Sequence, residues 1–173
     1  MSFMPSVSPK TYTYRNAAFK LLAYVWAAPN SALGLLFGLV MLGLGGKVHF
    51  VAGVAEFNGG KLGRFFTSHP QPFCLGAITL GHVILGTSQK QLAALRVHEH
   101  VHVSQYERWG MFFLPAYALS SLWELTHGRC GYRNNFFERQ AYAIEDNQKL
   151  QASVCTKQNK PNNGHLKQPT KLL

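Results

Sequence analysis

Residues 87–110 read TSQKQLAALRVHEHVHVSQYERWG, and the organisation of the whole chain is best worked out from this stretch. No glycine or proline occurs in it before Gly110. Thr87 or Ser88 can cap its start, and the residues that follow, QKQLAALR, are mostly good helix formers. The stretch therefore predicts a long helix that ends at Gly110.

The centre of this helix carries the pattern HExxH, with His98, Glu99 and His102 as its defining residues. Positions four apart share one face of a helix, so His98 and His102 can present two imidazoles to one Zn²⁺. Glu99 lies beside them, where it can take a proton from a metal-bound water and return it to a leaving amine. As a strand, VHEHVHV would instead place His98, His100 and His102 on one face, but the flanking residues favour the helix. On the helix, His100 points away from the metal.

A catalytic zinc needs a third protein ligand and one open position. The downstream candidates are one histidine and three acidic residues: His127, Glu138, Glu145 and Asp146. Glu138 lies in NNFFERQAYAIED, at the start of a second predicted helix that Asn134 or Asn135 can cap and that extends to about Lys149. The alternative for Glu138 is a solvated glutamate stabilised by the helix dipole.

The HExxH motif and the later Glu138, with the small Ala141 three places on, resemble the two motifs of gluzincin-type zinc metallopeptidases. This resemblance implies that His98, His102 and Glu138 bind zinc and that Glu99 is the general base. It also implies a peptide or protein substrate and a zincin-like active-site helix beside a second, ligand-bearing helix. The whole chain further resembles short bacterial membrane-associated HExxH proteins, which implies a location at the bacterial inner membrane.

Tyr142 is a departure from the pattern of the resemblance. Thermolysin-like members carry an acidic residue at this place, four positions after the ligand glutamate, to orient a histidine, so support for the ligands must come from elsewhere. Peptide hydrolysis also needs a donor near the developing oxyanion. The candidates by proximity in sequence are Tyr106, Tyr132, Arg133 and Tyr142. His82 is either structural or lies on a strand beside the helix, where zincins pair with an extended substrate.

Two apolar stretches outside the helices predict strands. Residues 48–57, VHFVAGVAEF, are rich in Val and Phe and end at the turn signal Asn58-Gly59-Gly60. Residues 74–85, CLGAITLGHVIL, form the second predicted strand. Together with the two predicted helices they indicate a small sheet and an α+β fold.

The stretch 21–44, LLAYVWAAPNSALGLLFGLVMLGL, carries no charge and is long enough to cross a bilayer. Pro29 interrupts it, so one kinked helix and a shallow hairpin are both open. Gly34 and Gly38 form the GxxxG pattern of close helix packing. The segment therefore predicts an N-terminal hydrophobic membrane helix or hairpin.

A second apolar stretch, 111–123, is too short to cross a membrane. If His102 and Glu138 share a metal, both ends of this stretch must lie on the same side of the membrane, so it cannot be a single crossing. We expect it to pack at the membrane surface or against residues 31–44, where its small residues could approach Gly34 and Gly38.

The chain of 173 residues has 17 Lys and Arg against 7 Asp and Glu, a formal charge of +10. All of the acidic residues except Glu56 lie between Glu99 and Asp146, so the positive charge belongs to the two ends and to the segment after the apolar stretch. This distribution suits anionic lipid headgroups. No specific nucleic-acid partner is expected, because most aromatics lie in apolar runs and no binding module is visible.

These observations predict four parts: a mobile basic arm at 1–20, a hydrophobic membrane segment at 21–46, a zincin-like domain at 47–150 and a disordered tail rich in Lys, Asn and Gln at 151–173. Three cysteines without paired spacing indicate neither a disulfide framework nor a CxxC zinc site. The expected function is a membrane-associated zinc metallopeptidase that hydrolyses peptide bonds by zinc-activated water. The alternative is a non-catalytic membrane-anchored zinc-binding scaffold or regulator.

Overall fold

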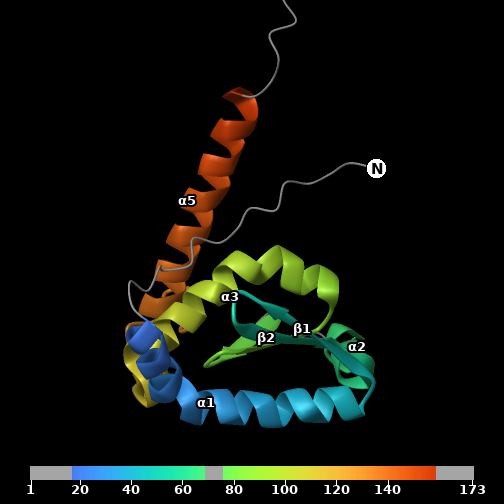
Figure 1. Ribbon diagram of the computed structural model, residues 1–173. Coiled ribbons are helices and arrows are strands. Elements are labelled where there is room, and N and C mark those ends of the chain that lie inside the picture. Colours follow the sequence, from blue (N-terminus) through green and yellow to red (C-terminus); the bar gives the residue numbers. More distant parts are fainter. Residues whose placement is uncertain (1–16, 69–75, 159–173) are drawn as a thin grey trace, which may run out of the picture.

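The computed structural model describes residues 17–68 and 76–158, and it confirms an α+β fold around a four-stranded sheet (Figure 1). The elements follow in the order α1 (Ala17–Gly43), β1 (Gly46–Val51), β2 (Val54–Gly59), α2 (Gly60–Ser68), β3 (Ala77–Leu80), β4 (Val83–Gly86), α3 (Gln89–Trp109), the 3-10 turn η1 (Gly110–Phe112), α4 (Phe113–Thr126) and α5 (Phe136–Gln158).

Each of the two predicted strands is a two-stranded hairpin, so the expectation of single strands was wrong. The first hairpin turns at Ala52 and Gly53, whose φ angles are 51° and 86°, and the second turns at Gly81 and His82. β1 pairs antiparallel with β2, β2 pairs parallel with β4, and β4 pairs antiparallel with β3, which gives the order β1-β2-β4-β3. Two apolar strands separated by a two-residue turn with a single glycine look like one longer strand in sequence.

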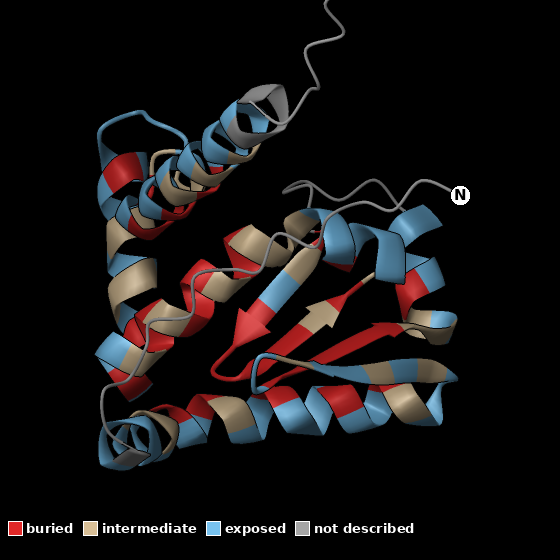
Figure 2. Cartoon of the chain, turned by 45° about the horizontal axis from the view of Figure 1, so that its top comes forward, coloured by how far each residue is buried: buried red, intermediate tan, exposed pale blue. Residues whose placement is uncertain are grey.

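Helices α1 and α3 cover opposite faces of the sheet, and the buried residues line the interfaces between these layers (Figure 2). Successive residues of a strand point to opposite faces. One core cluster therefore joins α1 to the sheet through Met41, Ala55, Phe57 and Val83. A second cluster joins the sheet to α3 through Val54, Ile84, Leu92 and Val103.

The apolar N-terminal segment is one continuous helix rather than a hairpin, and α1 bends along its length, with Pro29 inside it (Figure 1). It is the only described helix that is long and apolar enough to cross a membrane. A Cβ atom on Gly34 would lie 2.7 Å from Val83 Cβ, and one on Gly38 would lie 2.6 Å from the Phe57 ring. The GxxxG glycines thus pack closely against the sheet, and not against residues 111–123 as suggested by sequence.

The predicted ends of α3 and the predicted start of α5 are confirmed. The Ser88 side chain accepts a hydrogen bond from the Gln91 N–H, and α3 ends at Gly110, whose φ is 57°. In the loop before α5, the Asn135 side chain accepts from the Phe137 N–H at 2.9 Å. These caps are local contacts, which explains why the sequence signals were informative.

The predicted boundaries of the two ends need correction. Helix α1 begins at Ala17, inside the predicted arm, and residues 1–16 lie outside the described residues. Helix α5 continues past Lys149 to Gln158, so the first part of the predicted disordered tail is helical. The remaining tail residues, 159–173, lie outside the described residues.

Candidate metal centre

Three buried side chains from two helices converge on one point: His98 and His102 from α3, and Glu138 from the first turn of α5. The two Nε2 atoms lie 3.2 Å apart, and carboxylate oxygens of Glu138 lie 3.2 Å from Nε2 of His98 and 3.3 Å from Nε2 of His102. Tetrahedral zinc, with bonds of about 2.0–2.1 Å, holds its ligand atoms about 3.3 Å apart. The spacing therefore suits a four-coordinate metal ion.

Hydrogen bonds behind each imidazole decide which nitrogen faces the cluster. The Nε2 group of Gln105 donates to a backbone carbonyl of α5 at 3.1 Å, so the Gln105 Oε1 atom accepts from Nδ1 of His102 at 2.8 Å. A carboxylate oxygen of Glu145 accepts from Nδ1 of His98 at 3.3 Å. With both Nδ1 atoms protonated, both Nε2 atoms face the Glu138 carboxylate, where each can carry a proton or bind a metal ion through its lone pair. Three converging acceptors form the donor set of a cation site, so these residues could hold a metal ion.

Glu138 is ionised and held in place from a third element. Burial by itself would raise the pKa of Glu138, but the contacts with His102 and His98 outweigh it and keep this pKa at about 2. The hydroxyl of Tyr117, from α4, donates to a Glu138 oxygen at 2.8 Å. Burial and then the charge of Glu138 raise the pKa of Tyr117, so this hydroxyl stays protonated and remains a donor.

Glu99 lies next to the cluster with its carboxylate turned to the sheet. The Thr79 hydroxyl, on β3, donates to a Glu99 oxygen at 2.7 Å, and Glu99 is only 5% exposed. Burial would lower the pKa of His102, but Glu138 and the nearby charge of Glu99 outweigh it and raise this pKa. Glu99 therefore acts electrostatically on the same cluster that the three predicted ligands form.

Within the described residues, the structure brings one of the four third-ligand candidates to the two histidines, and that residue is Glu138. Glu145 contacts His98 from behind instead, at Nδ1. Asp146 is exposed. His127 is also exposed, at the end of α4, where its Nδ1 lies 2.7 Å from the Trp123 carbonyl oxygen.

The candidate oxyanion donors divide into two pairs. The Tyr106 ring is fully buried against Phe113, with a hydroxyl that has no hydrogen-bond partner within the described residues, and Arg133 is exposed. The ring of Tyr142 lies 4.7 Å from the ring of His98. Burial and then the charge of Glu138 raise the pKa of Tyr132, which places Tyr132 in the same electrostatic environment.

The other two singled-out histidines have structural partners. His100 points away from the cluster, as predicted for a helix, and its Nε2 lies 3.7 Å from a Glu56 oxygen. His82 lies in the turn between β3 and β4 rather than within a strand. Its Nε2 is 3.1 Å from a Glu107 oxygen and its ring stacks on Tyr24 at 3.8 Å, so His82 joins α1, the sheet and α3.

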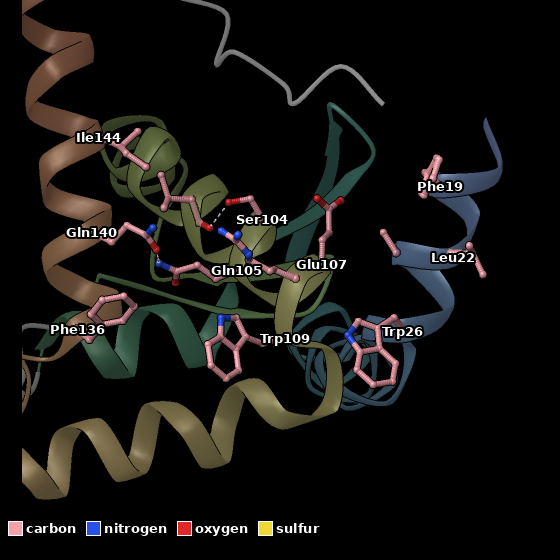
Figure 3. Close-up of a pocket in the computed structure, with 13 residues that line it drawn as sticks. Phe19, Leu22, Trp26, Ser104, Gln105, Glu107, Trp109, Phe136, Gln140 and Ile144 are labelled. Carbon is pink, nitrogen blue, oxygen red and sulfur yellow. Dashed lines mark hydrogen bonds between the residues drawn. The ribbon is translucent and has the colours of Figure 1, made fainter. Parts of the chain in front are cut away.

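A pocket of roughly 970 Å³ opens beside the cluster, between the first part of α1, the end of α3 and the start of α5 (Figure 3). Its lining is largely aromatic and apolar, with Trp26, Trp109 and Phe136 around it. None of the three metal-binding residues lines the pocket. Gln105 links the pocket to the metal cluster, because it lines the pocket and also accepts a hydrogen bond from His102.

Sequence reasoning missed Gln105, Tyr117 and Thr79 as parts of the site. Gln105 carries a local signal, because it follows His102 by three residues on the same helix. Tyr117 and Thr79 lie in apolar stretches of other elements and carry none. Comparisons with protein families, with curated proteins and with solved structures found no match to this chain.

Proposed function

We propose that the protein is a membrane-associated zinc metallopeptidase that hydrolyses peptide bonds. The observation that supports this most is the buried group of His98, His102 and Glu138 with Glu99 beside it. The backing of both imidazoles by acceptors adds to it, since oriented imidazoles are typical of zinc ligands. Bound zinc supplies a Lewis acid that polarises a carbonyl and lowers the pKa of a water molecule.

The residues of this chain have separate roles in the proposed reaction. His98, His102 and Glu138 hold the metal, while Gln105 and Glu145 keep the imidazoles in the tautomer that binds it. The Glu99 carboxylate accepts the proton of the attacking water and later gives it to the leaving amine. The Thr79 hydroxyl orients that carboxylate through its 2.7 Å hydrogen bond.

Among the described strands, β3 has a neighbour on one side only, and this edge supports a peptide as the substrate. Leu80 pairs with Val83 across a two-residue turn, and the Thr87 N–H donates to the Gly76 carbonyl at 3.1 Å. In an antiparallel ladder with this register, the backbone groups of Ala77 and Thr79 point away from β4. An extended peptide could pair with them, and it would then lie beside Glu99, which Thr79 contacts.

A specific observation favours the second candidate, a non-catalytic zinc-binding scaffold or regulator. His98, Glu99, His102 and Glu138 are all at most 8% exposed, and Glu99 is already hydrogen-bonded. A structural metal site is closed in this way, whereas a catalytic one keeps a position for water and substrate. The scaffold would therefore bind the same metal as the peptidase, and the two proposals differ only in the role of Glu99.

The experiment that separates the two is Glu99→Gln in zinc-loaded protein, assayed with a broad peptide library. A peptidase should lose about 10²- to 10⁴-fold in rate, because a general base is removed while the ligands remain. If wild type and Glu99→Gln both bind zinc and neither cleaves any peptide, the peptidase proposal fails and the scaffold proposal remains. Metal analysis of Glu138→Ala, with the exposed His127→Ala as control, tests the site itself. Unchanged zinc in Glu138→Ala would contradict it.

A further inference from the structure

Helix α1 is buried along one narrow stripe and is apolar around most of the rest of its circumference. The buried positions are Ala27, Asn30, Gly34, Gly38 and Met41. We call the residues away from this stripe the outer face of α1, and they are Leu33, Leu35, Leu36, Phe37, Leu39 and Val40, each 41–62% exposed. Contiguous exposed apolar surface of this kind marks an interaction site.

The sheet accompanies α1 along about two thirds of its length, from Tyr24 to Met41. At one end, the Tyr24 hydroxyl donates to the Gly53 carbonyl in the β1–β2 turn at 2.8 Å. In the middle, the His82 N–H donates to the Ser31 hydroxyl at 3.0 Å. At the other end, a Cβ on Gly46 would lie 2.8 Å from the Met41 carbonyl oxygen. The contacts from Tyr24 to Met41 cover about 26 Å of helix at 1.5 Å per residue, close to the thickness of the hydrocarbon core.

This packing is incompatible with a helix that crosses the bilayer. If α1 crossed, β1 would lie at the same depth, and β1 is an edge strand of the sheet with exposed Lys47 and His49. Unpaired backbone groups of a sheet edge do not occur in the hydrocarbon region, because nothing there can hydrogen-bond to them. Length and composition therefore permit a span that the tertiary contacts of α1 do not.

We propose that α1 lies in the plane of an anionic membrane, with its outer face in the lipid and the sheet on its other side. The occupant is a lipid surface because exposed basic residues lie at both ends of the apolar stretch of this helix, with Lys20 in its first turn and Lys47 after its end. Lys61 and Arg64, on the adjoining α2, are exposed as well. Cations at the rim of an apolar helix face suit anionic headgroups.

The proposed lipid surface extends from α1 to η1. Trp26 and Phe112 lie with ring centroids 5.9 Å apart and are 42% and 56% exposed. The neighbouring Met111 is 49% exposed. Tryptophan favours the level of the headgroups, where its ring is half in lipid and half in water. The inference rests on the membrane association in the proposed function, but not on peptidase activity.

The first test counts labels on single molecules. Ala18→Cys and Gly43→Cys are combined in a chain whose three native cysteines are replaced by serine, and the protein is reconstituted into phosphatidylglycerol–phosphatidylcholine vesicles. A membrane-impermeant maleimide is then added outside. An in-plane α1 puts both ends on one side, so mass spectrometry should find molecules with two labels or none. Molecules with one label each would show a span and overturn the proposal. Retained zinc and peptidase assays on the same sample report separately on the proposed function.

The second test identifies the occupant of the outer face. Leu36→Asp should lower binding to these vesicles by about tenfold or more, because it removes a buried apolar group and adds a negative charge. Leu150→Asp is the matched control, since Leu150 is 64% exposed against 59% for Leu36 and lies on α5, which extends away from α1 (Figure 1). Equal loss in both variants, or a lipid-free dimer that only Leu36→Asp dissociates, would overturn a lipid surface as the occupant.

Discussion

Helix α1 and the α3–α5 pair distribute polarity in opposite ways. On α1, Leu36 and Leu39 are 59% and 62% exposed. Between α3 and α5, His98 and Glu138 are 4% and 3% exposed. A water-soluble chain would ordinarily have leucine inside and glutamate outside. Both regions therefore depart from the ordinary pattern, each in its own direction.

Each departure points to a partner of opposite character. A buried carboxylate facing two imidazole lone pairs is costly unless a cation or proton lies between them. An exposed apolar helix face is costly unless lipid or another apolar surface covers it. The metal proposed for the cluster would balance the buried carboxylate, and the membrane proposed for α1 would cover the exposed leucines. In both cases a partner of matching polarity removes the cost. Substitutions on α3, on α1 and behind a metal ligand test whether each region depends on the contacts described.

The largest effect is expected at the ion pair that fastens α3 to the sheet. Arg96 donates two hydrogen bonds to Glu56, each at 2.9 Å, and Glu56 is 1% exposed. Arg96→Ala should lower the free energy of unfolding by about 3 kcal/mol, because it leaves a buried carboxylate without its partner. Urea unfolding measures the change. Arg108→Ala, an exposed position on the same helix, is the control and should change it by less than about 0.5 kcal/mol.

The same ion pair predicts a dependence on pH. Burial would raise the pKa of Glu56, but His100 and Arg96 outweigh it and lower this pKa from 4.5 to about 2. A lowered pKa in the folded state contributes stability that is complete above pH 4.5 and is lost as the pH falls towards about 2. Unfolding free energies measured across this window should fall in the wild type and fall less steeply in Arg96→Ala. Parallel curves would contradict the assignment to Glu56.

An intermediate effect is expected on the packed side of α1. Gly38→Leu should cost about 2 kcal/mol of folding stability, because even a Cβ atom there would lie 2.6 Å from the Phe57 ring. Gly43→Leu is the same change where nothing lies within 4 Å of the new Cβ, and it should be near neutral. Thermal unfolding of both variants tests the difference. Equal stability would show that α1 does not pack on the sheet in solution.

A third effect, on metal affinity rather than on folding, is expected behind a metal ligand. Gln105→Leu removes the acceptor for Nδ1 of His102 and should weaken zinc binding by about 10- to 100-fold, while Gln105→Glu keeps an acceptor and should weaken it less. Competition with a chromophoric chelator measures both affinities. If the two variants bind zinc as tightly as the wild type, the orientation of His102 does not depend on Gln105.

Features that depend on residues close together in the chain were predicted well from the sequence. The ends of α3 depend on Ser88 and Gly110, and the face shared by His98 and His102 depends only on helical spacing, so each was visible locally. Glu138 was selected by resemblance to a motif on another helix, and its place beside the histidines is a contact between α3 and α5. Glu145 lies seven residues after Glu138, two helical turns along the same face of α5, and contacts Nδ1 of His98. It thus orients a histidine, the role that Tyr142 cannot take.

The two hairpins and the position of α1 were not accessible in the same way. A turn such as Ala52-Gly53 differs little in sequence from the interior of a strand, since alanine is not a typical turn residue. Hydropathy predicted that residues 21–44 meet lipid, but it carries no information on whether the helix axis crosses the membrane or lies in its plane. The same composition suits a helix that crosses a membrane and one that lies on it.

Local sequence alone was therefore enough for the helix that carries HExxH, for its caps and for the apolar character of α1, because these depend on residues within a few positions of one another. The tertiary structure decided which acidic residue joins His98 and His102, which groups orient them, and that the sheet runs along α1 from Tyr24 to Met41. These features depend on contacts between residues far apart in the chain. Their geometry is set by how the helices and the sheet pack, which no short-range spacing encodes.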